Sequence, residues 1–305
     1  MNLKTSLFFL WALTILILWE PVFATWTIPV PVTEVNTYYH DKAPFLSFDG
    51  LTLYFCRQDG PVGWATRIYQ ATRNQPYGPF SSVKEISTMN YPYGHVSDPW
   101  VSPDNLRMYY YRTGGGISRL MLTKRASINN PWLPGVEILE LNVLGSVYNP
   151  RLTPDELTMV FSGNNLSGGK GGLDIWIANR PNTSSPFSNV TNLDEINTAA
   201  SDGHPYISSD GMTLYFASDR NSSGIGQLFK ATRDSLDDPF DNLEHLSFFD
   251  SPGSSVQFPF ISSDGSTFYF AKSISGAPLD IYVSYIPEPA TILLLGLGVV
   301  MLRKK

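Results

Sequence analysis

Cysteine, charge and helix-type periodicity are all scarce in this chain of 305 residues. The single cysteine, Cys56, cannot form an internal bridge, so no disulfide framework holds the protein together. Its place in an apolar, strand-like stretch predicts a buried, unreactive thiol. Charged residues make up only 16% of the chain, and the net charge is −6. Because no basic run occurs before the final residues, the sequence argues against a nucleic-acid partner.

Several sequence signatures of catalysis are also missing. The chain has no G-x-S-x-G, no H-E-x-x-H and no paired cysteines, and it shows no amphipathic helix pattern of useful length. The glycine-rich segment 163–172 imitates the spacing of a phosphate-binding loop. However, Gly169 stands where that loop needs lysine, and no Ser or Thr follows Lys170. We therefore predict an inter-strand loop there.

Aromatic residues, glycine and proline are abundant, which favours an all-β protein. One segment recurs five times, for example as H-P-Y-I-S-S-D-G-M-T-L-Y-F. Its aspartates are spaced by 55, 51, 55 and 54 residues, and a proline precedes each by five. These pairs are Pro44 and Asp49, Pro99 and Asp104, Pro150 and Asp155, Pro205 and Asp210, and Pro259 and Asp264. A period near 50 with strand patterning indicates propeller blades.

The repeat unit predicts four strands. Proline begins the first strand, S-x-D-G forms a tight turn with glycine at positive φ, and an aromatic strand follows. Asn105 and Glu156 replace that glycine in two repeats, so we expect those turns to differ. In four repeats the third strand ends on an arginine, six residues before a proline, and these arginines are expected to pair with acids or carbonyls: Arg73, Arg125, Arg180 and Arg233.

The fifth repeat lacks a fourth strand, and the N-terminal segment offers a replacement. Residues 34–37 (E-V-N-T) match residues 195–198 (E-I-N-T), and Asn36 lies eight residues before Pro44, as Asn197 does before Pro205. The sequence therefore predicts a five-bladed β-propeller over residues 25–286, closed by its N-terminal strand. Closure removes open sheet edges.

These repeats resemble the PD40 or TolB-like WD40 propeller repeat, whose usual core is P-x-W-S-P-D-G-x-x-L-x-F. Residues 102–104 (S-P-D) and 153–155 (T-P-D) keep that form most closely. The resemblance implies the fold over almost all of residues 26–285. It does not imply one activity, because this fold carries many functions.

Both termini indicate export. Lys4, an apolar stretch over residues 7–18 and the small-residue site ending at Ala24 predict a secretory signal peptide over residues 1–24, removed by signal peptidase. At the other end, Pro287-Glu288-Pro289 precedes an apolar segment and a basic tail.

This C-terminal arrangement over residues 287–305 resembles the PEP-CTERM sorting signal; an ordinary membrane anchor is the alternative. The resemblance implies a short transmembrane helix and processing by a membrane exosortase. It also implies that the protein is tethered in the inner membrane before release or attachment at the cell surface. The apolar segment is shorter than the roughly 20 residues that a bilayer core requires, so anchoring is expected to be transient.

A polar set recurs in the loops that lead into the first strand of each blade. Ring closure would gather these loops at one mouth of the central channel, where a convergent polar cluster is a candidate site. The candidate ligand-binding residues are His40, Asp41, His95, Asp98, Asn149, Asp202 and His204.

Three interpretations of this cluster stay open. The residues could cap strands and bind channel water, or they could bind a ligand or a divalent cation. Alternatively, Asp41 and Asp98 could act as a catalytic pair on a glycosidic bond. The aromatic side chains of Trp64, Tyr91, Tyr93 and Trp100 could stack on sugars or pack between blades.

The sequence thus predicts an exported binding or scaffold module without a required cofactor. Its expected ligand is an extracellular polysaccharide or a surface protein, because the family of the sorting signal is linked to exopolysaccharide production. A carbohydrate-active enzyme is the alternative.

Overall fold

The computed structural model describes residues 26–58, 65–90, 94–221 and 224–286. The predicted signal peptide and the sorting segment, with its Pro287-Glu288-Pro289 motif and apolar stretch, lie outside the described residues, as do Trp64, Tyr91 and Tyr93. In the part of the chain that is described, no helix has the length and apolar character needed to cross a membrane.

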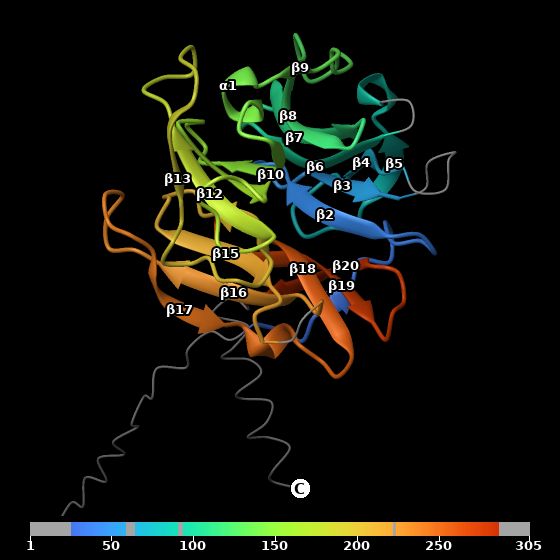
Figure 1. Cartoon of the computed structure of the whole chain (residues 1–305). Coiled ribbons are helices and arrows are strands. Elements are labelled where there is room, and N and C mark those ends of the chain that lie inside the picture. Colours follow the sequence, from blue (N-terminus) through green and yellow to red (C-terminus); the bar gives the residue numbers. More distant parts are fainter. Residues whose placement is uncertain (1–25, 59–64, 91–93, 222–223, 287–305) are drawn as a thin grey trace, which may run out of the picture. The chain divides into compact units, whose positions relative to one another are not determined.

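The described residues form five antiparallel sheets of four strands each (Figure 1). Blade one contains β2 (Asp41–Leu46), β3 (Thr52–Arg57), β4 (Arg67–Thr72) and β5 (Ser81–Glu85); blade two contains β6 (His95–Val101), β7 (Arg107–Gly114), β8 (Ile117–Lys124) and β9 (Val136–Glu137). Blade three contains β10 (Ser146–Leu152), β11 (Thr158–Asn164), β12 (Leu173–Asn179) and β13 (Ser188–Asn192). Blade four contains β14 (Asp202–Ile207), β15 (Thr213–Ser218), β16 (Gln227–Thr232) and β17 (Asp241–His245).

Blade five contains β18 (Ser254–Ile261), β19 (Thr267–Ile274), β20 (Asp280–Tyr285) and the N-terminal β1 (Val30–Pro31). Short helices connect some blades: η1 (Ser87–Met89), α1 (Leu139–Asn142) and η2 (Ser247–Phe249). Figure 1 shows β2, β6, β10 and β18 around the middle of the ring and β5, β9, β13 and β17 at its perimeter. The predicted five-bladed propeller is confirmed.

The N-terminal strand closes the ring, as predicted. β1 pairs antiparallel with β20, with Val30 opposite Val283. The side chain of Asn36 strengthens this closure, because its amide donates to the carbonyl of Ile281 (2.9 Å) and accepts the N–H of the same residue (2.8 Å). Asn197 makes the same pair of bonds to Ile175 within the continuous blade three. The matching E-V-N-T and E-I-N-T segments are therefore one structural device used twice.

The S-x-D turns also form as predicted. In blade one the hydroxyl of Ser47 donates to Asp49 (2.6 Å), and the same carboxylate oxygen accepts the N–H of Leu51 (3.0 Å). The other four turns repeat both bonds. The expectation that two turns differ is wrong, since Asn105 (φ 59°) and Glu156 (φ 61°) adopt the left-handed conformation of the glycines they replace.

Glu156 has a second role that a glycine could not fill. Its buried carboxylate accepts hydrogen bonds from Arg107 Nε (2.7 Å) and from the hydroxyl of Tyr109 (2.8 Å), both in blade two. Arg180 Nη2 lies 3.6 Å away on the other side. The unfavourable backbone conformation is thus offset by an ionic contact between blades.

The four repeat arginines bind carbonyls, which confirms one of the two expected pairings. In each case Nε donates to the carbonyl at the positive-φ residue of the S-x-D turn, as Arg73 does to Gly50 (2.6 Å). Each guanidinium also lies over an aromatic ring seven residues ahead, at 4.3–4.6 Å from the ring centre. The P-F or P-W pair after each arginine supplies this ring.

The clusters of buried apolar side chains lie entirely within Trp26–Ile286. Trp100 belongs to the largest cluster and is almost completely buried, so it packs in the core. Because this span contains both a core and the ring closure, it has the properties of an independently folding domain.

Replacing Asn36 by alanine should weaken ring closure. The change removes two hydrogen bonds and leaves the backbone N–H and C=O of Ile281 without these partners. The free energy of unfolding should therefore fall by about 1–3 kcal/mol. Urea denaturation would measure this loss, and hydrogen exchange would report opening of β20. Asn197→Ala is the matched control, since it removes the same two bonds without touching the closure. Equal exchange of the β20 amides in both variants would contradict the prediction.

Candidate functional site

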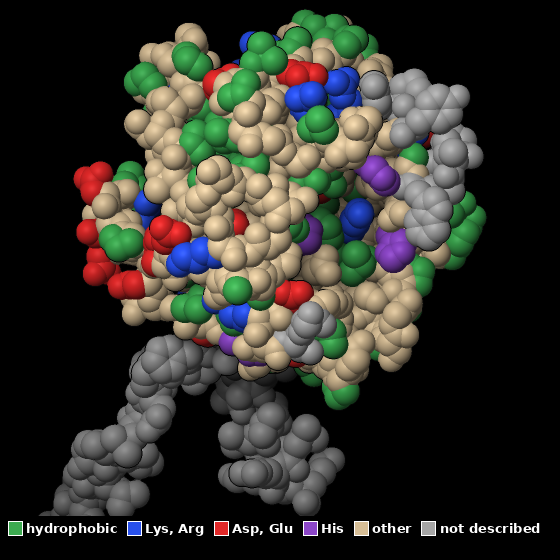
Figure 2. All heavy atoms as spheres, in the orientation of Figure 1, with side chains coloured by type: hydrophobic (Ala, Val, Ile, Leu, Met, Phe, Trp, Pro, Cys, Tyr) green, Lys and Arg blue, Asp and Glu red, His purple; other side chains and the backbone are tan. Residues whose placement is uncertain are grey.

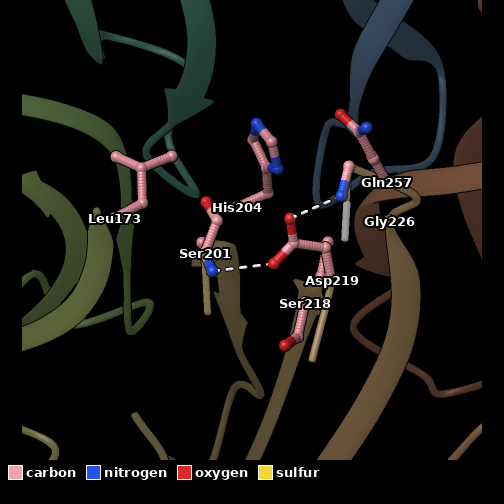
Figure 3. A pocket seen from close by; sticks show the side chains of 10 residues that line it. Leu173, Ser201, His204, Ser218, Asp219, Gly226 and Gln257 are labelled. Carbon is pink, nitrogen blue, oxygen red and sulfur yellow. Dashed lines mark hydrogen bonds between the residues drawn. The ribbon is translucent and has the colours of Figure 1, made fainter. Parts of the chain in front are cut away.

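One face of the propeller carries the loops that lead into the first strand of each blade. A cavity of about 200 Å³ opens there over blade four, and its walls include Ser201, His204, Asp219 and Gln257. In Figure 3 these side chains surround one hollow, with the Asp219 carboxylate accepting the N–H of Ser201 (2.8 Å). Loops between the second and third strands, such as the one after Ser218, contribute to the same cavity. Of the seven predicted site residues, His204 alone lines this cavity, so the gathering of the whole set at one mouth stays a prediction.

A backbone bulge shapes this mouth in every blade. The residue before each repeat proline is left-handed, with φ between 51° and 60°, and the ladder to the second strand shifts register there. The five bulge residues are Ala43, Asp98, Asn149, His204 and Phe258. A non-glycine residue at positive φ before proline is sterically unfavourable. Because all five blades contain it, the bulge belongs to the fold, and the side chains it carries differ from blade to blade.

Below the bulge residues, the next layer fills the centre of the ring. It consists of the residues that follow the prolines: Phe45, Trp100, Arg151, Tyr206 and Phe260, all buried. Phe45 contacts Trp100 (6.0 Å between ring centres) and Phe260 (5.1 Å), and Phe260 contacts Tyr206 (5.1 Å). Blade three departs from this pattern by placing a guanidinium among four aromatic rings.

Arg151 and Asp98 form a loose, buried ion pair. Arg151 Nη1 donates to the carbonyl of Asp98 (3.1 Å) and to two proline carbonyls, while its Nη2 lies 3.9 Å from Asp98 Oδ1. The side chains are 3% and 1% exposed. Arg151 Nε and Asp98 Oδ1 each lack a hydrogen-bond partner among the described residues. Burial lowers the pKa of Arg151, and the carboxylate of Asp98 opposes that shift.

His204 and Asn149 are the other polar bulge residues. The His204 ring contacts Phe258 in a tilted arrangement, with 3.9 Å between ring centres, and the backbone N–H of His204 donates to Ser162 Oγ (3.2 Å). Burial lowers the pKa of His204 to about 4, so the ring is neutral at pH 7. Asn149 is almost fully buried, on the blade that supplies Arg151.

Asp41 and Asp202 are held differently from the other predicted site residues. Both are fully buried. Asp41 accepts hydrogen bonds from Arg57 Nε (2.7 Å) and from the N–H (2.7 Å) and hydroxyl (2.8 Å) of Thr37. Asp202 accepts the corresponding bonds from Thr198 and from Arg220 (2.6 Å). Burial raises the pKa of Asp41 in spite of its arginine. These contacts give both carboxylates a structural role at the start of a strand.

The Asp41–Asp98 arrangement does not favour two-carboxylate hydrolysis. Such a mechanism needs both groups to reach the sugar and an attacking water. Each oxygen of Asp41 already accepts a hydrogen bond, from Thr37 or from Arg57. Of these two aspartates, only Asp98 has a carboxylate oxygen without a hydrogen-bond partner among the described residues.

His40 and His95 are half-buried at the mouth, and their Nδ1 atoms are occupied. His40 Nδ1 accepts the N–H of Leu279 (3.0 Å), and His95 Nδ1 accepts the N–H of Thr66 (3.2 Å). Burial, followed by the charge of Lys42, lowers the pKa of both rings. Each ring is therefore a neutral imidazole whose proton is on Nε2.

Three residues of the mouth were not among the sequence candidates. They are Lys42, Arg151 and Phe258. Lys42 is half-buried beside the ring of Phe258, with 5.8 Å between Nζ and the ring centre. The recurring proline gave a usable signal, because the residues before and after it occupy equivalent places in every blade. Alignment on that proline places Phe258 and Arg151 in the two central layers.

Metal binding gains no support from the described residues. Within 26–58, 65–90, 94–221 and 224–286, no group of three or more His, Cys, Asp or Glu side chains is placed to hold a metal ion. The divalent cation at the mouth stays a prediction.

Cys56 is buried, as predicted, and it supports the neighbouring bulge. Its Sγ accepts the N–H of Asp98 (3.2 Å), as Ser162 Oγ accepts the N–H of His204 (3.2 Å). Burial and the nearby carboxylate raise the pKa of the thiol to about 12, so the thiolate is negligible at neutral pH. The two residues hold equivalent positions on the second strands of blades one and three.

Substituting Cys56 should reveal this support. Cys56→Ala leaves the Asp98 N–H buried without a partner, and we expect a loss of about 1–3 kcal/mol in unfolding free energy. Cys56→Ser keeps an acceptor, as Ser162 does, and should lose less. Urea denaturation of both variants measures the difference. A serine variant as unstable as the alanine variant would contradict the prediction, because the hydrogen-bond acceptor would then contribute nothing to stability.

The half-buried His204 should make stability depend on pH. The folded pKa of His204 is about 4, below the ordinary value of 6.5, so the unfolded chain binds a proton first as the pH falls. Stability should therefore decrease from pH 6.5 towards pH 4. His204→Asn tolerates the left-handed backbone and should flatten this decrease. Thermal unfolding of the parent and variant proteins across this pH range provides the measurement. If the stability of both proteins fell equally with pH, the prediction would be wrong.

Fold and site together define a β-propeller with a polar pocket at one mouth of its channel. Residues 286–305 match the PEP-CTERM protein-sorting motif. The motif identifies the chain as an exported sorting substrate that is processed by an exosortase, in agreement with the resemblance seen in the sequence. A comparison with curated proteins finds no match for the chain.

Solved structures with the same fold include a TolB-like protein from Agrobacterium tumefaciens, at 15% identity and a TM-score of 0.51, covering 85% of this chain and 97% of that one. An α-L-arabinofuranosidase from Podospora anserina, in complex with cellotriose, has 14% identity and a TM-score of 0.56 over 86% and 96% of the two chains. A GH62 hydrolase in complex with xylotriose has 11% identity and a TM-score of 0.54 over 81% and 92%. At these identities the likeness concerns the fold alone.

Proposed function

We propose that this exported propeller is a binding module that holds an extracellular polysaccharide at the channel mouth, without hydrolysing it. The observation that carries the proposal is the pair of unsatisfied buried groups, Asp98 Oδ1 and Arg151 Nε. They lie in the two central layers, and the charges of both residues act on the ring of His204, while Asn149 lies on the same strand as Arg151.

Unpaired buried polar groups favour a polar occupant. Each one costs about 1–3 kcal/mol unless a hydrogen bond completes it. The carboxylate oxygen of Asp98 accepts, the guanidinium nitrogen of Arg151 donates, and the amide of Asn149 does both. A hydroxyl group can donate to the first and accept from the second through a water molecule, since both atoms are buried. Sugars present many hydroxyls, so this set of groups suits a polysaccharide.

The mouth is also rigid, which favours selective binding. Its polar side chains stand on β-strands at backbone bulges, and hydrogen bonds to Cys56 and Ser162 hold the bulge N–H groups of Asp98 and His204. Side chains on fixed elements lose little conformational entropy when a ligand binds.

Export and the structural neighbours agree with this class of ligand. A chain that carries the sorting motif meets polymers outside the cytoplasm. Two neighbours of the same fold are described in complex with cellotriose and xylotriose, so the architecture can accommodate an oligosaccharide. Binding is preferred to hydrolysis because the oxygens of Asp41 are already engaged by Arg57 and Thr37.

Asn149→Ala should weaken polysaccharide binding about tenfold, since one good hydrogen bond is worth about 1.4 kcal/mol. Alanine is tolerated at this bulge, as Ala43 shows in blade one. Residues 26–286 would first be screened by thermal shift against neutral and acidic bacterial polysaccharides, because a ligand of the native state raises its stability. Isothermal titration would then give affinities.

Asn189→Ala is the matched control. Asn189 lies on the outer strand of the same blade with nearly the same φ (51° against 53°), and it should bind like the parent protein. No shift with any polysaccharide would overturn the proposal and turn attention to a surface protein as partner. Equal losses of affinity in both variants would show that the polysaccharide does not bind at the channel mouth.

A further inference from the structure

Lys42 introduces a positive charge that hydroxyl binding alone does not require. It lies on β2, one residue before the bulge of blade one, and its Nζ is 5.8 Å from the centre of the Phe258 ring. Its charge acts on His40, His95 and His204, which come from three different blades. Figure 2 shows a Lys or Arg side chain among histidine side chains at a hollow of this face. Lys42 is therefore a half-buried cation whose charge reaches histidines of three blades.

The described residues provide no carboxylate partner for Lys42. Asp41 is paired with Arg57 (2.7 Å), and Asp98 faces Arg151 (3.9 Å). No other acid in the described ranges lies within ion-pair distance of its ammonium group. Arg67, a second cation that acts on His95, binds the carbonyls of Thr66 (3.1 Å) and Gly94 (2.9 Å). The charged groups that act on the three mouth histidines are thus three cations (Lys42, Arg67, Arg151) and two carboxylates (Asp41, Asp98) that face arginines.

His40 and His95 add neutral donors next to this charge. Backbone N–H groups occupy both Nδ1 atoms, so the proton of each ring must be on Nε2, the far side of the imidazole. His40 directly precedes β2, two residues before Lys42 in the chain. Within the described residues, no hydrogen-bond acceptor is assigned to either Nε2. An ammonium group and two fixed N–H donors make a site for an oxygen anion.

We propose that Lys42, His40 and His95 form an anion site that binds the carboxylate group of an acidic polysaccharide. The inference rests on the proposed function and specifies its ligand. Hydroxyl-binding groups of Asp98, Asn149 and Arg151 occupy the same mouth, so the ligand must carry a carboxylate and hydroxyls close together. Uronic acid units have both.

The test compares two forms of one polymer. Polygalacturonate carries a carboxylate on each sugar, and its fully methyl-esterified form has the same backbone without the charge. We expect residues 26–286 to bind the acid at least about tenfold more tightly than the ester. Raising the salt from about 50 mM to about 500 mM should weaken binding of the acid and leave the ester unchanged.

Three substitutions locate the site. Lys42→Met keeps the length of the stem, removes the charge and should abolish the preference for the acid, whereas Lys42→Arg should retain it. His95→Asn keeps an acceptor for the Thr66 N–H but removes the Nε2 donor, and it should weaken acid binding without affecting the ester. Lys84→Met is the control, since Lys84 is exposed on the outer strand of the same blade and should leave both affinities unchanged. Thermal unfolding identifies any variant that fails to fold.

The outcomes separate this inference from the proposed function. Equal binding of acid and ester, or equal effects of Lys42→Met and Lys84→Met, overturns the anion site and leaves polysaccharide binding in place. Absence of binding to every polysaccharide overturns both. Poly-L-glutamate bound as tightly as polygalacturonate would show that the carboxylate is recognised without a sugar and would overturn the polysaccharide assignment.

Discussion

The left-handed residue before each repeat proline is the constraint on which the centre of this propeller depends. Five strands must converge on one axis, and each gives up its regular ladder at the same point, between residues such as Ser97 and Trp100. The bulge directs one side chain towards the mouth, and the residue after the proline enters the central layer. Acceptors on the preceding blade, such as Cys56 and Ser162, satisfy N–H groups that the bulge releases.

A repeated scaffold with a few unlike residues explains how one site can arise in a nearly symmetric ring. Four central positions are aromatic, and the fifth is Arg151, whose guanidinium lies 3.9 Å from the carboxylate of Asp98. At the turns, Glu156 replaces a glycine, keeps its backbone conformation and gains an ionic contact with blade two. In both cases the repeat sets the backbone, and a single departure from it supplies the chemistry. This division is typical of folds that carry many functions.

The two buried aspartates illustrate how similar residues acquire different roles. Asp41 and Asp202 follow an N-T pair by four residues, and each is held by that threonine and by an arginine 16 or 18 residues further on. Asp98 lacks this environment and faces a guanidinium at 3.9 Å instead. Conversely, Lys42 has no carboxylate partner in the described chain, although its neighbour Asp41 has an arginine. Pairing, more than residue type, therefore distinguishes a binding group from a structural one.

The sequence by itself determined the number of blades, the S-x-D turns and the closure of blade five by the N-terminal strand. These features depend on local turn chemistry and on spacing along the chain, both of which can be counted. Only the tertiary structure decided which polar residues share the mouth, since the bulge and the arginines that capture Asp41 and Asp202 set the direction and pairing of each side chain. The central layer likewise depends on residues about 50 apart that meet only when the ring closes. For that physical reason, the sequence alone did not place Arg151, Phe258 and Lys42 in one site.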